Sequence, residues 1–303
     1  MVKISIVIVS FNVEEYIKKC IDSILLQQDE AVEIIVADNN SKDGTVEFIK
    51  SKYPSIKLIC NSSNAGFSAA NNMGIEEASG DLLFLLNPDT ELKVPGTLQE
   101  IRKYMEINPG TAILAPCLLN TDGSYQHSFW QYSPVKDTLF ALFNIHAKNT
   151  LNPPSAPIPI QVASGAALVF RRTLSDEIGG LDENMFWMED IDFCYRAWRL
   201  GKRIIFNPEV KIIHHGGKSS VKNEAVAIPN QVLSKIKFSQ KNDTKLIFYA
   251  VNSLYLLYIC SRFFASALLS ITSEKYAAKR RAYGITFRAY FNFNFRDKKD
   301  IIT

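Results

Sequence analysis

Acidic side chains crowd one short stretch of the sequence, residues 179–192, where aromatic residues flank them. Such crowding costs electrostatic repulsion unless a cation or a proton-transfer task explains it. Either Glu189 or Asp190 could therefore serve as a general base. The alternative is structural, because acids also stabilise the N-terminus of a helix, and a helix is expected to follow. Two arginines one to two turns further on, Arg196 and Arg199, could neutralise these acids or a phosphate.

A second acidic site follows an apolar run, residues 82–86, that is typical of a buried strand. Asn87-Pro88-Asp89 comes directly after it, and Pro88 stiffens the turn. Asp89, with Glu91 close behind, could hold a hard divalent cation, since Mg²⁺ commonly binds one or two carboxylates together with substrate phosphates. An ordinary Asn-Pro-Asp turn is the alternative.

Two further polar segments contain candidate ligand-binding residues. Asp38 ends an apolar run and could accept hydrogen bonds from a base or a ribose hydroxyl, or it could form an Asx-turn with the residues after it. Residues 64–74 are rich in small side chains and open a helix, which favours close approach of a ligand and binding of an anion. Tight packing of a helix on a sheet is the alternative explanation, above all for Gly74.

A histidine pair, His214 and His215, follows a strand-like run and precedes Gly216, Gly217 and Lys218. A histidine at a strand end beside glycines can bind a metal. The glycines and Lys218 would also suit a loop that contacts phosphate. A structural or surface role is the alternative for the pair.

Regular alternation of strands and helices would position these residues. The expected strands are residues 4–10, 33–37, 56–60, 82–86, 162–170 and 210–213, and the expected helices are residues 14–27, 44–52, 67–78 and 190–200. An Asp-Gly pair at residues 122–123 predicts a hairpin. The alternation predicts an α/β fold with a mostly parallel central sheet and flanking helices. Such sheets bind ligands beyond the carboxyl ends of their strands.

Composition narrows the class of protein. The 303 residues are 47% hydrophobic, which fits a globular protein of one large domain or two small ones. Five cysteines without a CxxC pair argue against a disulfide framework or a cysteine-based zinc site, and they suit a reducing compartment. The N-terminal residues are not typical of a secretory signal. No GxGxxG or GxxxxGKS/T motif occurs, so dinucleotide and P-loop sites lose support.

A series of motifs in this order resembles those of family 2 glycosyltransferases with the GT-A fold, and within them the rhamnosyltransferase-like branch. The motifs are residues 9–12, 38–44, 64–74, 87–89, 180–183, 189–192 and 214–217. The resemblance implies an inverting glycosyltransferase with a nucleotide-diphospho-sugar donor linked to dTDP, UDP or GDP. The sugar, with rhamnose among the candidates, would pass to a hydroxyl group of a glycan or a lipid-linked saccharide.

The resemblance also implies roles for individual residues. Asp190 would be the catalytic base, and Glu189 remains the second catalytic candidate. Asp89 and His214 would hold a Mg²⁺ or Mn²⁺ ion that bridges the donor diphosphate. Asn87 stands where many relatives have aspartate, so one formal charge is missing. The residues implied in donor binding are Ser10, Asn12, Asp38, Asn64, Gly66, Asn71 and Asn87.

Two other functions remain open. A nucleotidyltransferase also pairs a nucleotide pocket with a metal-binding acid, but it would need a glycine-rich, basic phosphate loop after the first strand. Residues 10–12 do not supply such a loop. A catalytically inactive protein that binds sugar nucleotides or acts as a scaffold is the other alternative, and the acids at Asp89 and Asp190 speak against it.

The C-terminal part of the chain differs in charge from the rest. From Lys235 onward it has 13 basic and 4 acidic residues, a net charge of +9, whereas the remainder carries −6. Two apolar runs, 246–261 and 263–271, flank Arg262, and basic and aromatic residues follow. This pattern favours attachment to an anionic membrane surface. A packed helical hairpin or a homodimer interface is the alternative, and the acidic body argues against nucleic acid as a partner.

We therefore expect two domains, a GT-A domain over residues 1–235 and a helical extension, basic and aromatic, over residues 236–303. A lipid-linked acceptor would give the membrane attachment a purpose. The expected location is the cytoplasm, at the inner face of the cell membrane.

Overall fold

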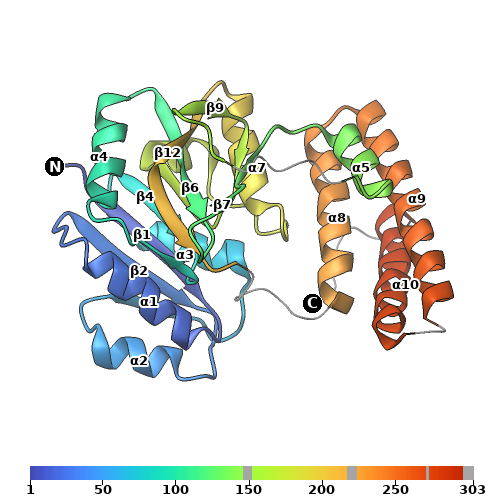
Figure 1. The fold of residues 1–303 in the computed structure, drawn as a ribbon, viewed down its shortest axis with the longest axis horizontal. Coiled ribbons are helices and arrows are strands. Elements are labelled where there is room, and N and C mark those ends of the chain that lie inside the picture. Colours follow the sequence, from blue (N-terminus) through green and yellow to red (C-terminus); the bar gives the residue numbers. More distant parts are fainter. Residues whose placement is uncertain (146–151, 217–223, 271–272, 296–303) are drawn as a thin grey trace. The chain divides into compact units, whose positions relative to one another are not determined.

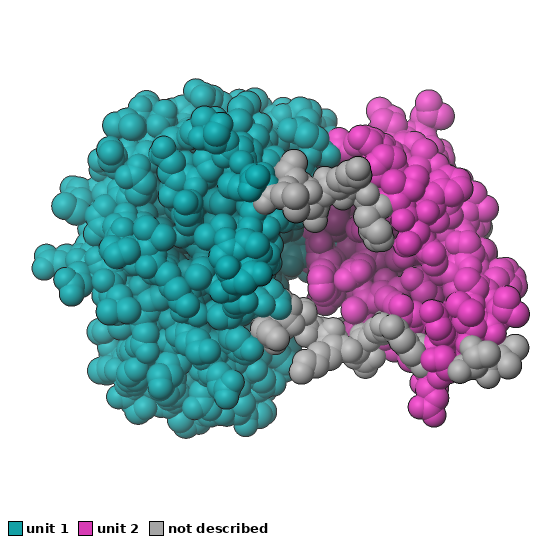
Figure 2. All heavy atoms as spheres, in the orientation of Figure 1, with its two compact units in different colours: residues 1–131, 149–184, 189–219 teal, residues 132–148, 185–188, 220–303 magenta. Residues whose placement is uncertain are grey.

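A computed structural model describes residues 1–145, 152–216, 224–270 and 273–295, and the chain divides into two compact units (Figure 1, Figure 2). Unit 1 comprises residues 1–131, 149–184 and 189–219, and unit 2 comprises residues 132–148, 185–188 and 220–303. The expected boundary after residue 235 falls inside helix α8 (Glu224–Asn242), and unit 2 also takes in residues from the middle of the chain. Lys218 of the expected phosphate loop lies outside the described residues.

Unit 1 begins with the strand–helix alternation that the sequence predicts. Its first elements are β1 (Ile4–Ser10), α1 (Glu14–Leu25), β2 (Val32–Asp38), α2 (Thr45–Lys52), β3 (Lys57–Cys60), α3 (Phe67–Glu77) and β4 (Leu82–Leu86). The four strands pair in parallel in the order β3-β2-β1-β4. Their carboxyl ends consequently share one edge of the sheet, where Ser10 lies opposite Asp38 and Asp38 lies opposite Cys60.

Helices cover both faces of this sheet. Successive side chains of a strand point to opposite faces, so one strand contacts helices on both sides. Ile4, Ile6 and Ile8 of β1 belong to a buried cluster with residues of α1, α2 and α4 (Thr97–Ile107). The odd-numbered residues Val7 and Val9 face α3: Val9 forms a cluster with Ala70, and a Cβ atom on Gly74 would clash with Val7. Glycine at position 74 therefore lets α3 approach the sheet closely, as the packing explanation of the sequence predicts.

The rest of the sheet is mixed. Its strands are β5 (Thr90–Glu91), β6 (Thr111–Leu119), β7 (Tyr125–Gln126), β9 (Ile158–Ile160), β11 (Ala167–Arg171) and β12 (Arg203–His214). β11 runs antiparallel to both β4 and β6, whereas β12 runs parallel to β6 and antiparallel to β5 and β9. The expected parallel pairing thus holds for the first four strands and for β6 with β12. The hairpin expected at residues 122–123 joins β6 to β7.

The single strand expected over residues 162–170 is instead two strands in different sheets. β10 (Val162–Ala163) pairs with β8 (Phe129–Trp130), and β11 pairs with β4. Between them the chain turns, since Ser164 Oγ accepts a hydrogen bond from Ala166 N at 3.3 Å. Two further helices follow in unit 1, α6 (Arg172–Ile178) and α7 (Glu189–Arg199). Phe193 of α7 packs on Phe170 of β11, with 4.8 Å between ring centroids.

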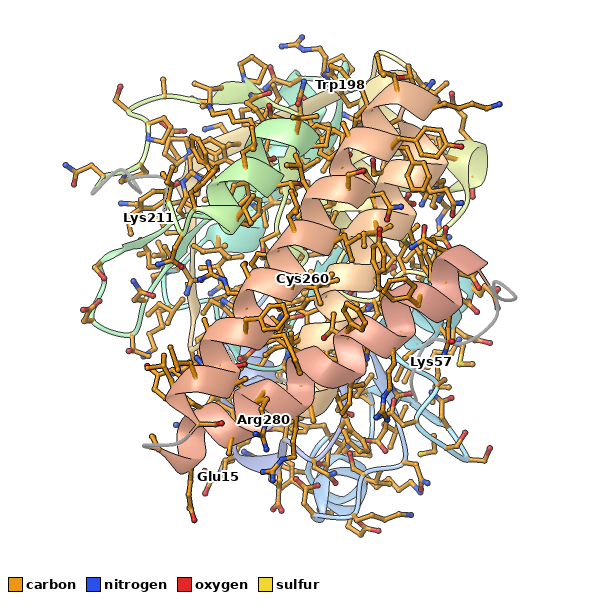
Figure 3. All side chains as sticks on the ribbon, turned by 90° about the vertical axis from the view of Figure 1, so that its right-hand side faces the viewer. Glu15, Lys57, Trp198, Lys211, Cys260 and Arg280 are labelled. Atoms are coloured by element: carbon orange, nitrogen blue, oxygen red, sulfur yellow. The ribbon has the colours of Figure 1, made fainter. Side chains whose placement is uncertain are left out.

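Unit 2 is helical in its described part. It contains α5 (Pro134–Leu142), α8, α9 (Lys245–Leu269) and α10 (Glu274–Phe295). Val251, Tyr255 and Ile259 of α9 are buried in a cluster with residues of α8 and α10. Figure 3 looks onto α9 and α10, which Cys260 and Arg280 mark. By length and composition α9 could cross a membrane, and only 17% of its most apolar 18-residue stretch is buried.

Candidate functional site

Several of the residues predicted from the sequence lie where β1, β2 and β4 end. The chain passes from β1 to β2 and β3 on one side and then returns to β4 on the other side of β1. In open α/β sheets such a reversal leaves a crevice beyond the carboxyl ends of the strands. Ser10 and Asp38 lie on one side of this point, and Asn87 directly follows β4 on the other.

Asp38 is fully buried and holds the loop after β2. Its Oδ2 accepts hydrogen bonds from Ser10 Oγ at 2.7 Å and from Ser41 Oγ at 2.6 Å, and its Oδ1 accepts one from Ser41 N at 2.8 Å. The contacts with Ser41 form the turn that the sequence allowed as the alternative. The structure therefore brings Ser10 and Asp38 together, and part of the hydrogen-bonding capacity of this carboxylate shapes the loop.

Asparagine side chains shape the backbone next to Asp38. Asn12 adopts a left-handed conformation (φ 53°), and its Oδ1 accepts a hydrogen bond from Lys42 N at 2.7 Å. Asn64 Oδ1 accepts one from Gly66 N at 3.0 Å. The buried Asn39 donates to the carbonyl of Gly66 at 3.1 Å, which attaches this loop to the end of β2.

The two asparagines in the middle of α3 differ in their contacts. Asn71 is buried, and its amide nitrogen donates to the carbonyl of Phe67 one turn earlier, at 2.9 Å. Asn72 instead accepts a hydrogen bond from Leu181 N at 2.8 Å and donates to Glu183 Oε1 at 2.9 Å. Asn72 therefore attaches α3 to the segment before α7. The contact with the sugar donor that the resemblance implies for Asn71 stays a prediction.

Asp89 and His214 lie side by side. His214 Nε2 is 3.4 Å from Asp89 Oδ1, and His214 Nδ1 is 2.8 Å from Gln126 Oε1. This proximity follows from the pairing of β5 with the end of β12, which sets His214 opposite Thr90, the residue after Asp89. Asp89 is buried, whereas His214 is partly exposed.

His215 belongs to a different pair. Its Nε2 is 2.5 Å from Glu91 Oε1, and Glu91 Oε2 is also 3.3 Å from Lys93 Nζ. Glu91 was considered from the sequence as a second acidic group beside Asp89, but its contacts are with His215 and Lys93. Of the two imidazole rings, it is that of His214 that lies beside the Asp89 carboxylate, whereas His215 contacts Asp89 through its backbone N–H, which donates to the Asp89 carbonyl at 2.9 Å.

The donor atoms around Asp89 fit a hard divalent cation. A carboxylate oxygen and an imidazole nitrogen face each other there, and the nearby Asn87 Oδ1 is buried with no hydrogen-bond partner in the described structure. Within the described residues, no group of three or more His, Cys, Asp or Glu side chains could hold a metal ion. Such a sparse set suits an ion that takes its remaining ligands from phosphate and water, as Mg²⁺ commonly does.

Asp190, in the first turn of α7, lies against the turn between β10 and β11. Its Oδ2 accepts a hydrogen bond from Gly165 N at 2.6 Å, and its Oδ1 accepts one from Ile191 N at 2.8 Å. Burial raises the pKa of the Asp190 carboxyl above its ordinary value, and these hydrogen bonds only partly oppose the rise. A Cβ atom at Gly165 would stand 3.0 Å from Asp190 Cβ, so glycine permits this close contact.

A short chain of contacts links Asp190 to the Asp89 segment. Gly165 binds Asp190, and the carbonyl of the next residue, Ala166, accepts a hydrogen bond from Asn87 N at 2.9 Å. The link arises because β11 begins opposite Leu86, the last residue of β4, so the turn before β11 lies beside Asn87. The predicted base and the predicted metal ligands therefore flank the same strand end.

Arg196 has a structural role. Its Nε lies 2.7 Å from the buried carboxylate of Asp192, and its terminal nitrogens donate to the carbonyls of Ile178 and Gly180 at 2.6 Å each. Arg196 therefore pairs with one of the acids of residues 179–192, as the sequence allowed, and that acid is Asp192. Glu189 begins α7 next to Asp190.

Three residues with contacts in the site were not predicted as site residues, namely Asn39, Gln126 and Gly165. Asn39 and Gly165 lie in segments that the sequence had singled out, and a glycine inside the strand predicted over residues 162–170 was a usable signal for Gly165. Gln126 gave no signal, because its contact with His214 joins residues that are 88 positions apart.

Comparisons with known proteins bear on the family and the fold of the chain. The profile of glycosyl transferase family 2 matches residues 5–179. The chain is 26% identical, over 243 residues, to an N-acetylglucosaminyl-diphospho-decaprenol L-rhamnosyltransferase of Mycobacterium tuberculosis, covering 73% of this chain and 78% of that protein. It is 30% identical, over 210 residues, to the low-salt glycan biosynthesis hexosyltransferase Agl10 of Haloferax volcanii, covering 65% of this chain and 62% of that protein.

Among solved structures, the chain is similar to the mannosyltransferase PcManGT of Pyrobaculum calidifontis in complex with GDP-Man and Mn²⁺. The TM-score is 0.58 at 14% sequence identity, and the match covers 98% of this chain and 88% of that chain. At this identity the likeness concerns the fold, and it confirms the α/β GT-A architecture predicted from the sequence.

Proposed function

Because this chain belongs to glycosyl transferase family 2 and is a glycosyltransferase, we propose that it moves a sugar from a nucleotide-diphospho-sugar to a hydroxyl group with inversion at the anomeric carbon. The observation that carries the proposal is the position of Asp190. A carboxyl group with a raised pKa lies, through Gly165 and Ala166, beside the strand end that carries Asp89. A base and an acidic cation ligand on either side of one strand end are what a direct displacement needs.

Asp190 would remove the proton of the acceptor hydroxyl as the new bond forms. The acceptor oxygen bonds to the anomeric carbon, the bond from that carbon to the diphosphate breaks, and the proton ends on Asp190. A general base works best when its pKa lies close to the working pH, and burial shifts the pKa of Asp190 in that direction. Hydrogen bonds from Gly165 and Ile191 fix the carboxyl group, and each oxygen retains a further lone pair.

Asp89 and His214, with Asn87 beside them, are the residues that would hold a divalent cation, Mg²⁺ or Mn²⁺. When bound, the ion would stabilise the charge that develops on the departing diphosphate. The Mn²⁺ and GDP-Man in the structure of the Pyrobaculum mannosyltransferase support a divalent cation as cofactor.

The donor would bind along the ends of β1 and β2, near Ser10, Asn12 and Asp38, and at the start of α3. The mycobacterial relative, a rhamnosyltransferase whose name gives a decaprenol-linked saccharide, supports rhamnose as the sugar and a lipid-linked saccharide as the acceptor. Donors linked to dTDP, UDP and GDP are the candidates to compare.

A thermal-shift panel of dTDP-, UDP- and GDP-sugars with Mn²⁺, followed by transfer assays with the donor that binds, tests the proposal. We expect one nucleotide class to raise Tm most, since a ligand at 100 times its Kd stabilises the native state by about 2.7 kcal/mol. Failure of every nucleotide sugar to bind would contradict the proposal. Binding without transfer or donor hydrolysis would favour an inactive binding protein, and synthesis of nucleotide sugar from a nucleoside triphosphate would favour a nucleotidyltransferase.

We also propose that unit 2 attaches the enzyme to an anionic membrane surface at the inner face of the cell membrane. The side of α9 away from its buried cluster carries exposed apolar residues, namely Leu246, Tyr249, Leu257, Phe264 and Leu268. Between residues 245 and 295 the sequence has seven basic residues and one acidic residue, Glu274. The buried face of α9 packs on neighbouring helices, and Arg262 donates to the carbonyl of Ala141 at 3.0 Å. One free apolar face with basic neighbours favours lying on the surface over spanning it.

Flotation with lipid vesicles tests this attachment. The intact protein should float with vesicles that contain phosphatidylglycerol and much less with pure phosphatidylcholine, because each basic residue near an anionic surface contributes about 1 kcal/mol. Phe264→Glu with Leu268→Glu should abolish flotation. Leu26→Glu, on an equally exposed leucine of unit 1, is the matched control and should float normally. Equal flotation of all three proteins would exclude the proposed face, and a dimer dissociated by the double variant would assign that face to a second copy.

A further inference from the structure

The orientation of His214 is set by a side chain from a distant hairpin. Gln126, in β7, places its Oε1 2.8 Å from His214 Nδ1. An amide oxygen can only accept a hydrogen bond, so His214 Nδ1 must carry the proton of this contact. The tautomer of His214 therefore depends on which atom of the Gln126 amide faces the ring.

A hydrogen-bond chain in the hairpin fixes that choice. Gln126 Nε2 donates to Asn120 Oδ1 at 3.1 Å, and Asn120 Nδ2 donates to Ser124 Oγ at 2.9 Å. Ser124 Oγ in turn donates to Asp122 Oδ1 at 2.6 Å. A carboxylate can only accept, so every amide in the chain has one orientation that satisfies it. Reversal of the Gln126 amide would place its NH₂ group against His214 Nδ1 and its oxygen against Asn120 Oδ1.

The backbone holds this hairpin against the end of β12. β6 lies between β7 and β12 at this point, with Leu118 paired to Gln126 on one side and to Ile212 on the other. The turn closes through hydrogen bonds from Asn120 N to the carbonyl of Ser124 at 2.8 Å and from Gly123 N to the carbonyl of Asn120 at 2.9 Å. The amide of Gln126 therefore reaches His214 from a hairpin that its own backbone hydrogen bonds close.

With the proton on Nδ1, the other ring nitrogen has a lone pair. That atom, His214 Nε2, is the one that faces Asp89 Oδ1 at 3.4 Å. In the neutral ring these two atoms are both acceptors, and a cation bound between them would take both as neighbouring ligands. Metal-bound histidines usually donate their second N–H to a protein acceptor, which fixes the ring and raises its basicity.

We propose that Gln126 is a positioning residue, which holds His214 as the Nδ1–H tautomer and thereby presents Nε2, together with Asp89, to a divalent cation. This inference rests on the proposed function, because it concerns the same cation. It adds a contribution from the 118–126 hairpin, which lies outside the motifs that suggested the site. His215 instead directs its Nε2 to Glu91.

Two measurements on purified protein test the role of Gln126. The first is the ¹⁵N chemical shifts of the His214 ring without metal, assigned with a His214→Asn variant. The second is the Kd for Mn²⁺ in the presence of nucleoside diphosphate, obtained from the electron paramagnetic resonance signal of free Mn²⁺. Gln126→Leu should give a mixture of tautomers and weaken Mn²⁺ binding by about 10–100-fold. Gln126→Glu retains an acceptor for Nδ1–H and should preserve the tautomer.

The matched control is Gln131→Leu, the same change at an exposed glutamine near the hairpin, and it should leave both measurements unchanged. Circular dichroism of all variants identifies any that fail to fold, and Gln126→Glu then carries the tautomer test. An unaltered tautomer and Kd in Gln126→Leu, with normal binding by the wild type, would overturn the role of Gln126 alone. Absence of Mn²⁺ binding by the wild type would overturn the metal site itself. It would also overturn the proposed role of a cation in the departure of the diphosphate.

Discussion

Asp190→Asn should bind donor nucleotide as tightly as the wild type yet lose turnover by about 10²–10⁴-fold or more, the usual contribution of general-base catalysis. Asparagine has the shape of aspartate, but its amide cannot take the proton of the acceptor hydroxyl. The hydrogen bond from Gly165 N can still be accepted by the amide oxygen, so the turn between β10 and β11 should persist. Measurement of kcat and of donor Kd by calorimetry separates the two effects.

Glu189→Gln is the matched control, because it neutralises the adjacent acid at the start of the same helix. We expect it to retain most activity, and the reverse outcome would assign the base to Glu189. The pH profile supplies a second check. Protonated Asp190 cannot accept a proton, so kcat should fall as the pH drops through its pKa. Since burial raises that pKa, the fall should begin at a higher pH than for an exposed aspartate. Near-normal turnover of Asp190→Asn would show that Asp190 is not the base.

Asp89→Ala should weaken nucleoside diphosphate binding when Mg²⁺ or Mn²⁺ is present and change it little in a chelator. Removal of one member of a buried charge pair costs about 2–5 kcal/mol, which is roughly 30-fold or more in Kd. The charge pair is the one that the Asp89 carboxylate would form with the cation, and the buried position of Asp89 is the reason to expect a loss of this size. Calorimetric titration with and without EDTA gives the comparison.

Glu91→Ala provides the control for Asp89, since it removes an acid two residues away that contacts His215 and Lys93 instead. Its effect on metal-dependent binding should be small. Equal weakening of Asp89→Ala with metal and with chelator would mean that Asp89 contacts the nucleotide or supports the fold without a cation. That result would leave the proposed function of Asp190 as the base intact, so either prediction can be wrong without the other.

Local sequence patterns were sufficient for the first four strands and the helices between them. β1 and β4 were predicted with the bounds that the structure has, because a run of buried apolar residues followed by a polar turn marks both the strand and its end. The same ends placed Asp38 and Asp89 at one edge of the sheet, since parallel strands finish together. The prediction of one strand over residues 162–170 was wrong. The strand is interrupted by a turn that depends on contacts with Ser164 Oγ and Asp190, and the local sequence pattern does not contain these contacts.

The sequence by itself determined the α/β alternation and which side chains stand at the ends of the parallel strands, because both depend on residues that are neighbours along the chain. Only the tertiary structure decided which partners those side chains meet. It inserted β11 antiparallel beside β4, which brought Gly165 to Asp190 and Ala166 to Asn87. It also paired His214 with Asp89 and Gln126, and His215 with Glu91. These contacts join residues 25 to 125 positions apart, and free energy from burial and pairing across the whole sheet, rather than any local preference, selects them.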